Sequence, residues 1–237
     1  MRVLGNALSI LGREAVRIVL PAICVGCRNE LPWSDRTTSC CARCWQTLPR
    51  INGTKCASCA LPIPDGERCI RCLDDPLPLD WCEAWGHYRG PLERVLHALK
   101  FERHDFYDEP LALLLDSVLP DRDFDLVLPV PMGRVKERRR GYNQAELLAR
   151  ALAERLGIEC HPPLLVKRAE REAQSKLRRA ARTANVRGVF AASPRVKGRK
   201  VLLVDDICTT GATLRACATA LRREGAARVC AVAVARA

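Results

Sequence analysis

The sequence predicts an α/β protein: a parallel, doubly wound sheet preceded by a small cysteine-rich domain. Ten of the 14 cysteines lie between Cys24 and Cys82. Beyond Trp81 the chain instead alternates short apolar runs with longer stretches of helical periodicity, which is typical of a parallel sheet with crossover helices. Because a proline-rich run over residues 74–81 separates these two parts of the sequence, we expect a domain boundary there. The predicted parts are an amphipathic helix over residues 1–20, a cysteine-rich domain over 21–80 and an α/β domain over 84–237.

Local signals predict the elements of the α/β domain in order. One helix begins at Pro91, whose fixed φ suits the first helical turn. Another spans 144–156, with Asn143 as its N-cap and Gly157 as its end. The remaining predictions are strands over 84–88, 126–129, 164–166, 201–204 and 229–234, and helices over 111–119 and from 210 or 211 to 224.

The first 20 residues predict a helix with one apolar face. Arg13, Glu14 and Arg17 interrupt the apolar residues before a membrane-spanning length accumulates, and no small-x-small cleavage site follows. The sequence leaves open whether this helix packs on its own protein or lies on a membrane surface. We expect no transmembrane span in the chain.

Eight of the cysteines form four C-x-x-C pairs, which indicate metal binding. Such a density could mark a disulfide framework, but only in a short secreted chain with a signal peptide, so we place this protein in the reducing cytoplasm. Two such pairs supply the four thiolates of a structural Zn²⁺ site, which we favour over redox dithiols or an iron–sulfur cluster. Pairing by local order or an interleaved pairing both satisfy the spacing, with one or two zinc ions. The predicted ligands are Cys24, Cys27, Cys41, Cys44, Cys56, Cys59, Cys69 and Cys72.

The positive charge is concentrated in one part of the chain. The net charge is +12, and residues 131–200 contain 19 Lys and Arg against six Asp and Glu, a local balance of +13. A solvated charged face would need more acidic residues to balance it. This excess predicts a polyanionic partner.

The run from Val201 to Leu214 has the order of a phosphate site: an apolar strand, two carboxylates, and a Thr/Gly turn that opens a helix. Ligands of open α/β sheets bind at the carboxyl ends of strands. The backbone N–H groups of such a turn can hold a phosphate, whereas adjacent carboxylates suit the hydroxyls of a sugar. No Walker A loop is present.

This run resembles the signature of the type I phosphoribosyltransferases. The resemblance implies a type I phosphoribosyltransferase fold that binds 5-phosphoribosyl-1-pyrophosphate (PRPP) with Mg²⁺. Asp205 and Asp206 would bind the ribose hydroxyls, and the 5-phosphate would lie on Thr209, Thr210, Gly211, Ala212 and Thr213. Thr209 stands where purine-salvage members carry an aspartate that is their proposed base. No catalytic residue is therefore assigned, and purine-base salvage is in doubt.

The order of motifs along the whole chain resembles the ComF family, which joins a double zinc ribbon to a phosphoribosyltransferase domain. The motifs are the C-x-x-C pairs, Y-x-G-P from Tyr88, Lys100-Phe101, the run Val130–Gln144 and the run Gln174–Phe190. The resemblance implies a pyrophosphate loop and a mobile basic hood formed by Pro131, Arg134, Lys136, Arg168, Gln174 and Arg182.

Two functions follow from this resemblance. In the first, the protein is a phosphoribosyltransferase with an unknown acceptor, in a pathway of competence and DNA uptake. The alternative is a single-stranded DNA-binding accessory factor of transformation whose phosphoribosyl site is a sensor or a relic. Both include single-stranded DNA as a partner, with a competence helicase as a further one, and the predicted DNA-binding residues are Arg138, Arg139 and Arg140.

Overall fold

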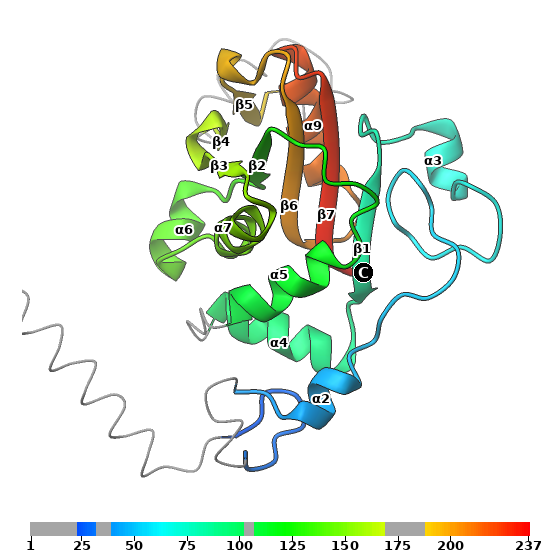
Figure 1. Cartoon of the computed structure of the whole chain (residues 1–237), viewed down its shortest axis with the longest axis vertical. Helices are drawn as coiled ribbons and strands as arrows, with labels where there is room; N and C mark the ends of the chain where they lie inside the picture. The colour runs from blue at the N-terminus through cyan, green and yellow to red at the C-terminus, as the bar shows by residue number, and fades with distance from the viewer. Residues whose placement is uncertain (1–22, 32–38, 102–106, 169–187) are drawn as a thin grey trace, which may run out of the picture.

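The computed structural model describes residues 23–31, 39–101, 107–168 and 188–237 (Figure 1). The predicted helix over 1–20, together with Gln174 and Arg182, lies outside these residues. Within the described part, no helix is both long and apolar enough to cross a membrane.

The centre of the molecule is a five-stranded, wholly parallel sheet in the order β1-β7-β6-β2-β3. The strands are β1 (Cys82–His87), β2 (Leu126–Pro129), β3 (Glu159–Cys160), β6 (Lys200–Cys208) and β7 (Arg228–Arg236). The middle residues of the three central strands are apolar and buried, as expected for a sheet with helices on both faces. The predicted α/β class and parallel sheet are confirmed.

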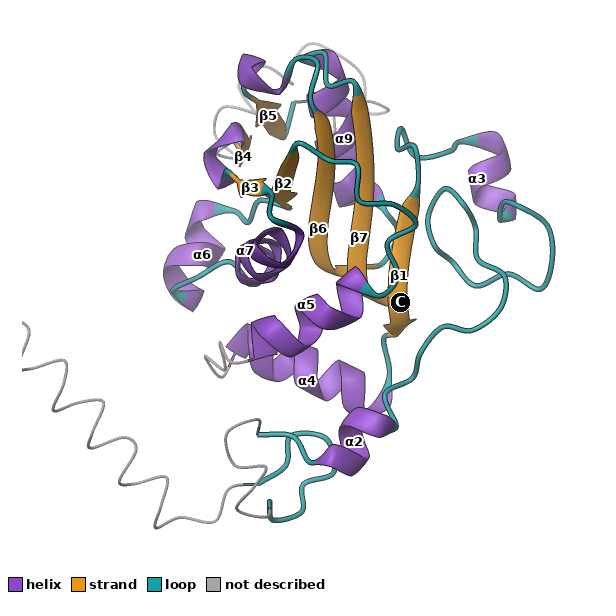
Figure 2. Cartoon of the chain, in the orientation of Figure 1, coloured by secondary structure: helices purple, strands orange, loops and turns teal. Residues whose placement is uncertain are grey.

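Helices form a layer on each side of the sheet (Figure 2). On one face, α4 (Gly90–Phe101), α5 (Asp108–Asp116) and α7 (Gln144–Leu156) pack against alternate residues of β6 and β7, including Leu202 and Val232. On the other face, α9 (Ala212–Arg223) packs against the intervening residues, including Leu203 and Ala231. Because successive side chains of a strand point to opposite faces of the sheet, the hydrophobic core consists of one layer on each face.

The predicted helix over 144–156 is confirmed in detail. The Asn143 side chain accepts a hydrogen bond from the N–H of Ala145, and Gly157 ends the helix in the left-handed conformation. The predicted strand 126–129 is also confirmed.

Several local predictions differ from the structure, and the helix predicted over 111–119 is α5, which spans Asp108–Asp116. The strand predicted to end at Val204 continues to Cys208, because β7 pairs with it along its whole length. The strand predicted over 164–166 is β4 (Leu165–Lys167), preceded by a 3-10 helix over Pro162–Leu164 and paired antiparallel with β5 (Phe190–Ala192). The basic segment Arg134–Arg140 forms helix α6, for which the sequence offered no apolar periodicity.

The cysteine-rich part contains two short helices, α2 (Ala42–Gln46) and α3 (Ile70–Asp74), each beginning directly after a cysteine. Helix α2 lies beside α4, whereas α3 lies beyond the edge strand β1 (Figure 1). The connection between them runs along that edge, where Arg50 forms an antiparallel bridge with Gly86. Both cysteine groups are thereby attached to the α/β domain at separate places.

Candidate functional site

The eight C-x-x-C cysteines form two clusters by local order. The first cysteine cluster is Cys24, Cys27, Cys41 and Cys44, and the second is Cys56, Cys59, Cys69 and Cys72. Within each cluster the sulfur atoms lie within 4.8 Å of one another. The Sγ–Sγ distance is 3.9 Å between Cys27 and Cys41 and 3.8 Å between Cys59 and Cys69.

These distances fit tetrahedral zinc. Zn–S bonds of about 2.3 Å place neighbouring sulfur atoms about 3.8 Å apart. Cys41 belongs to the first cluster and the adjacent Cys40 does not, as its spacing to Cys44 predicted. All 14 cysteines are free of disulfide bonds. The two clusters are therefore built as four-thiolate sites of the structural kind.

The first cysteine of each cluster has a lowered pKa, which favours the thiolate form that binds a metal. Burial opposes ionisation of Cys24, but the N–H groups of Cys41 and Gly26, each 3.3 Å from its sulfur, lower the pKa of this thiol to about 6. Cys56 is likewise buried, and backbone N–H groups around its sulfur lower its pKa to about 7. Gly26 is required for this turn, because a Cβ atom there would lie 2.6 Å from the sulfur of Cys44.

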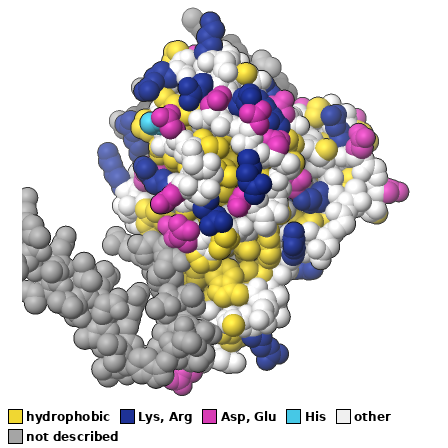
Figure 3. Space-filling view, viewed as in Figure 1, with side chains coloured by type: hydrophobic (Ala, Val, Ile, Leu, Met, Phe, Trp, Pro, Cys, Tyr) yellow, Lys and Arg dark blue, Asp and Glu magenta, His cyan; other side chains and the backbone are white. Residues whose placement is uncertain are grey.

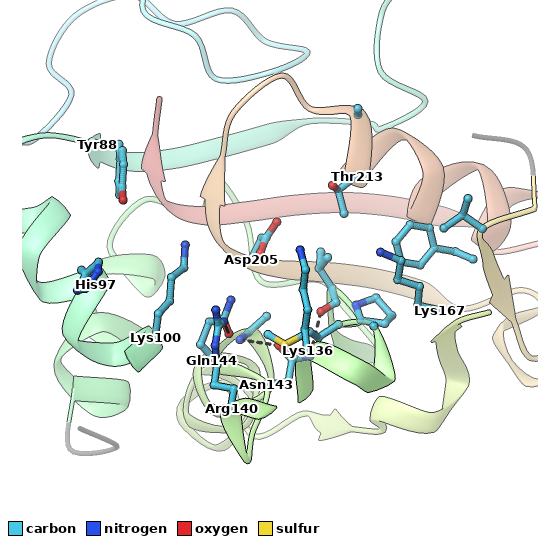
Figure 4. A pocket seen from close by; sticks show the side chains of 18 residues that line it. Tyr88, His97, Lys100, Lys136, Arg140, Asn143, Gln144, Lys167, Asp205 and Thr213 are labelled. Atoms are coloured by element: carbon cyan, nitrogen blue, oxygen red, sulfur yellow. Dashed lines mark hydrogen bonds between the residues drawn. The ribbon is translucent and has the colours of Figure 1, made fainter. Parts of the chain in front are cut away.

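A cavity of about 600 Å³ lies at the carboxyl ends of β2 and β6 (Figure 4). Its wall includes Asp205 from β6 and Thr213 from α9, the predicted sugar and phosphate residues. The side chains of Lys100 and Lys136 end on either side of Asp205. The cavity is thus a cationic pocket with one carboxylate at its centre.

Asp205 and Asp206 have different environments although they are consecutive. Asp205 faces the cavity, where burial and then the charge of Asp206 raise its pKa well above its usual range. Asp206 is only 4% exposed and forms an ion pair with Lys100, with 2.7 Å between the amine and the carboxylate. Because neighbouring strand residues point to opposite faces, only one of the two opens directly onto the ligand space.

The segment Thr209–Thr213, which we call the phosphate loop, joins β6 to α9. Gly211 adopts a left-handed φ of +77° at the N-cap of α9. The hydroxyl of Thr210 accepts a hydrogen bond of 3.3 Å from the N–H of Ala212, which fixes the turn. Ala212 and Thr213 line the cavity, so the positive end of the α9 dipole faces it.

The sequence around Arg140 to Gln144 builds the floor of the cavity. The Arg140 guanidinium donates to the side-chain carbonyl of Gln144, and both residues line the cavity. Asn143 not only caps α7 but also donates to the carbonyl of Val130, 3.1 Å away. Tyr142 donates to the carbonyl of Leu99 on α4. The segment therefore joins α4, α7 and the end of β2 around one space.

The residues predicted to bind pyrophosphate lie in two different cavities. Lys136 lines the 600 Å³ cavity, whereas Arg134 and Arg168 line a neighbouring cavity of about 430 Å³. Pro131 separates the two cavities and contributes to both. A further cation, Lys167, reaches the main cavity from β4, where its amine lies 5.9 Å from the ring centre of Phe190.

The three predicted DNA-binding arginines also separate. Arg138 and Arg139 are exposed on α6, whereas Arg140 is half-buried in the cavity wall. On the face shown in Figure 3, the coloured Lys and Arg side chains are interspersed with Asp and Glu. The positive charge of the described part therefore forms no continuous strip over this face.

The sequence prediction missed several residues that line the cavity. Tyr88, His97 and Lys100 come from the segment joining β1 to α4 and from α4 itself. Tyr88 and Lys100 belong to the short motifs that carried the family resemblance, but nothing in those motifs assigns them to the cavity. The tertiary packing of α4 and of the segment before it brings them there.

Two known domain families match this chain. Residues 15–73 match a double zinc ribbon domain, and residues 139–237 match a phosphoribosyl transferase domain. The first match contains both cysteine clusters. The second contains β6, the phosphate loop and α9.

The chain is also similar to whole proteins along most of its length. The chain is 31% identical over 220 residues to the DNA utilization protein YhgH of Escherichia coli K12, covering 90% of this chain and 96% of that one. It is 31% identical over 216 residues to competence protein F of Haemophilus influenzae, covering 85% and 91%. It is 30% identical over 197 residues to competence protein ComFC of Bacillus subtilis, covering 79% of each. With a double zinc ribbon match, a phosphoribosyl transferase match and these similarities along most of its length, the chain belongs to the ComF family.

Proposed function

We propose that this protein binds PRPP with Mg²⁺ in the 600 Å³ cavity. One observation carries the proposal: Asp205, the start of α9 and four cationic side chains open onto the same space. PRPP presents a ribose between two anionic groups, a monophosphate and a pyrophosphate. The cavity presents a carboxylate between an anion-binding turn and a cationic wall.

Each part of PRPP has a complementary group. Asp205 accepts hydrogen bonds from the ribose hydroxyls when it is ionised, and the phosphate loop donates N–H groups to the 5-phosphate. Lys136 and Arg140 offset the charge of the pyrophosphate. Lys100 neutralises Asp206 and so reduces the repulsion between the two adjacent carboxylates. Bound Mg²⁺, an oxygen-seeking cation, would screen the pyrophosphate and polarise it as a leaving group.

The same arrangement suits phosphoribosyl transfer. The bond between C1 of the ribose and the pyrophosphate oxygen breaks as an acceptor nucleophile bonds to C1. Lys136 and Arg140 then stabilise the charge that develops on the departing pyrophosphate. The complete set of groups supports a working pocket over a relic.

Calorimetric titration with PRPP tests this proposal. We expect saturable, Mg²⁺-dependent binding by the zinc-loaded protein and its loss in Asp205→Asn. Asp123→Asn is the matched control, because Asp123 is an exposed carboxylate paired with Lys200 on another part of the surface. Absence of binding by the folded wild-type protein would exclude PRPP as the ligand.

Single-stranded DNA is proposed as a partner at α6, outside the cavity. Arg138 and Arg139 are exposed there and carry no cavity contact. Replacing both with alanine should weaken binding to DNA of any sequence and reduce the slope of log affinity against log salt by about two. Unchanged affinity and slope would exclude this helix as the DNA site. We place both activities in the cytoplasm, where the free thiols of the clusters persist.

A further inference from the structure

We propose that Arg236 is a positioning residue that couples the second cysteine cluster to the phosphate loop. In this arrangement the loop holds its ligand-binding conformation only when that cluster contains its metal. The identity of the ligand rests on the proposed function. The coupling itself concerns only the cluster, Arg236 and the loop.

Arg236 connects the two structures directly. It lies in β7 beside Cys208, is only 3% exposed, and donates from Nε to the carbonyl of Cys59, 3.0 Å away. From Nη1 it donates to the carbonyl of Cys208, also at 3.0 Å, and to the carbonyl of Thr209. One planar guanidinium therefore joins a cysteine of the second cluster to the first residue of the phosphate loop.

The charge of Arg236 also favours a metal-filled cluster. In the described part of the chain Arg236 donates to main-chain oxygens and to the sulfur of Cys59, and no side-chain carboxylate pairs with it. A buried cation is costly without a compensating negative charge. One Zn²⁺ with four thiolates carries a net charge of −2, and the sulfur of Cys59 lies 3.9 Å from Nη2 of Arg236. The guanidinium thus acts as an outer-shell partner of the metal site.

A second, independent contact runs from the cluster to the loop. Ser58, between Cys56 and Cys59, accepts a hydrogen bond of 2.8 Å from the N–H of Leu77. Leu77 is buried against the second cluster and lies over Gly211, where an added Cβ atom would be 3.1 Å from it. The cluster therefore supports the loop through an apolar contact as well as through Arg236.

Helix α3 and the segment after it tie the same two regions together. The Arg71 guanidinium lies 3.4 Å from the carbonyl of Thr210. In the reverse direction, Arg215 on α9 forms an ion pair of 2.9 Å with Asp75 and donates to the carbonyl of Pro76. These contacts join α3 and the segment after it to Thr210 of the phosphate loop and to α9, the helix that follows the loop.

The first cysteine cluster provides the matched control. It packs with the helices on the α4 side of the sheet, where Arg94 donates to the carbonyl of Gly26 and Trp45 packs against Tyr107. Loss of its metal should disturb α4 and α5 and leave the phosphate loop in place.

Amide hydrogen exchange of the ligand-free, zinc-loaded protein tests the coupling. We expect exchange in the peptide covering 208–215 to be about tenfold faster in Arg236→Gln and in Cys69→Ser than in the wild type, because opening this segment no longer breaks the contacts with the cluster. Cys41→Ser should leave this peptide unchanged. Equal exchange in all four proteins, or an equal effect of Cys41→Ser, would overturn the proposal.

Two further variants keep the test decisive if Cys69→Ser does not fold. Arg236→Lys retains the charge but cannot span the carbonyls of Cys59 and Cys208 at once, so its exchange should lie between those of the wild type and Arg236→Gln. Leu77→Ala removes only the apolar contact and should also accelerate exchange. Wild-type exchange in both would contradict the coupling.

Titration of the same proteins with PRPP separates the two proposals. About tenfold weaker binding by Arg236→Gln, together with its faster loop exchange, supports both. Faster loop exchange in Arg236→Gln without PRPP binding by the wild type would reject PRPP and retain the coupling. Full PRPP affinity and unchanged exchange in Arg236→Gln would reject the coupling and retain PRPP.

Discussion

Each of the two cysteine clusters consists of two C-x-x-C pairs, yet the two clusters contact different parts of the molecule. The first includes the exposed Cys27 and packs on the helices that cover one face of the sheet. In the second, all four cysteines are buried and its neighbours are Leu77, Arg236 and the phosphate loop. The comparison shows that a zinc site takes its role from what it contacts.

Zinc-ligand substitutions should give the largest effects and separate the clusters. We expect about two zinc ions per wild-type chain and about one in either Cys44→Ser or Cys72→Ser, because each cluster needs all four thiolates. The free energy of metal binding is that of folding the cluster, so each change should cost more than about 5 kcal/mol locally. Elemental analysis and proteolysis of the cysteine-rich part check this. Two retained zinc ions in either variant would contradict separate sites.

The next largest effect should come from the ion pair that links α4, on the side of the first cluster, to β6. Asp206→Asn leaves Lys100 without its buried partner and should lower the free energy of unfolding by about 2 kcal/mol. Denaturant unfolding measures this. Asp123→Asn breaks an exposed pair with Lys200 and should cost under about 0.5 kcal/mol. Equal effects of the two changes would show that the Lys100–Asp206 pair contributes no more than a surface pair.

Apolar contacts sharpen the comparison between the clusters. Leu77→Ala and Trp45→Ala remove the side chains that pack the second and first cluster on the α/β domain, and each should cost about 2 kcal/mol. Only Leu77→Ala should also weaken PRPP binding, by about fivefold, because Leu77 alone lies over Gly211. Calorimetry with both variants decides this. A loss of affinity in Trp45→Ala would show that the clusters act on the site alike.

The smallest effect should be a gain in stability at Asp205, a carboxyl group without an ion pair among the described residues. Burial raises its pKa above the unfolded value, so its ionised form destabilises the fold as the pH rises through that raised pKa. Asp205→Asn should therefore stabilise the protein at pH 7 by about 1 kcal/mol, or roughly 2–4 °C in Tm. The gain should disappear below about pH 4, where Asp205 is protonated in both states. A lower Tm for Asp205→Asn at pH 7 would contradict this assignment.

The sequence predicted those features whose cause lies close by in the chain. The cap at Asn143, the apolar strand 126–129 and the two-residue spacing of the cysteines are local signals, and the structure agrees with each. The extension of β6 to Cys208 was not predictable in this way, because it depends on pairing with β7, which comes later in the chain.

The candidate site was predicted in part, and the predicted residues that line the cavity include Pro131 and Lys136. Asp205 and Thr213 follow a recognisable strand–turn–helix order, whereas Lys100, Arg140 and Lys167 reach the cavity from elements distant in the chain. Arg134, which lines the 430 Å³ cavity, and Lys136, which lines the 600 Å³ cavity, lie two residues apart on α6, so only the orientation of that helix distinguishes them. Which of two neighbouring side chains enters the cavity depends on how the helix packs in the folded protein.

The segment between the two clusters covers one edge of the parallel sheet. Residues 49–51 lie along the outer edge of β1, where the N–H of His87 donates to the carbonyl of Pro49 and the N–H of Ile51 to that of Trp85. These bonds occupy backbone groups that would otherwise pair with a strand of another molecule. At the opposite edge, β3 is only two residues long and offers little to pair with. Loss of metal from the clusters that anchor this chain would therefore free a sheet edge, so zinc depletion should lead to aggregation as well as to unfolding.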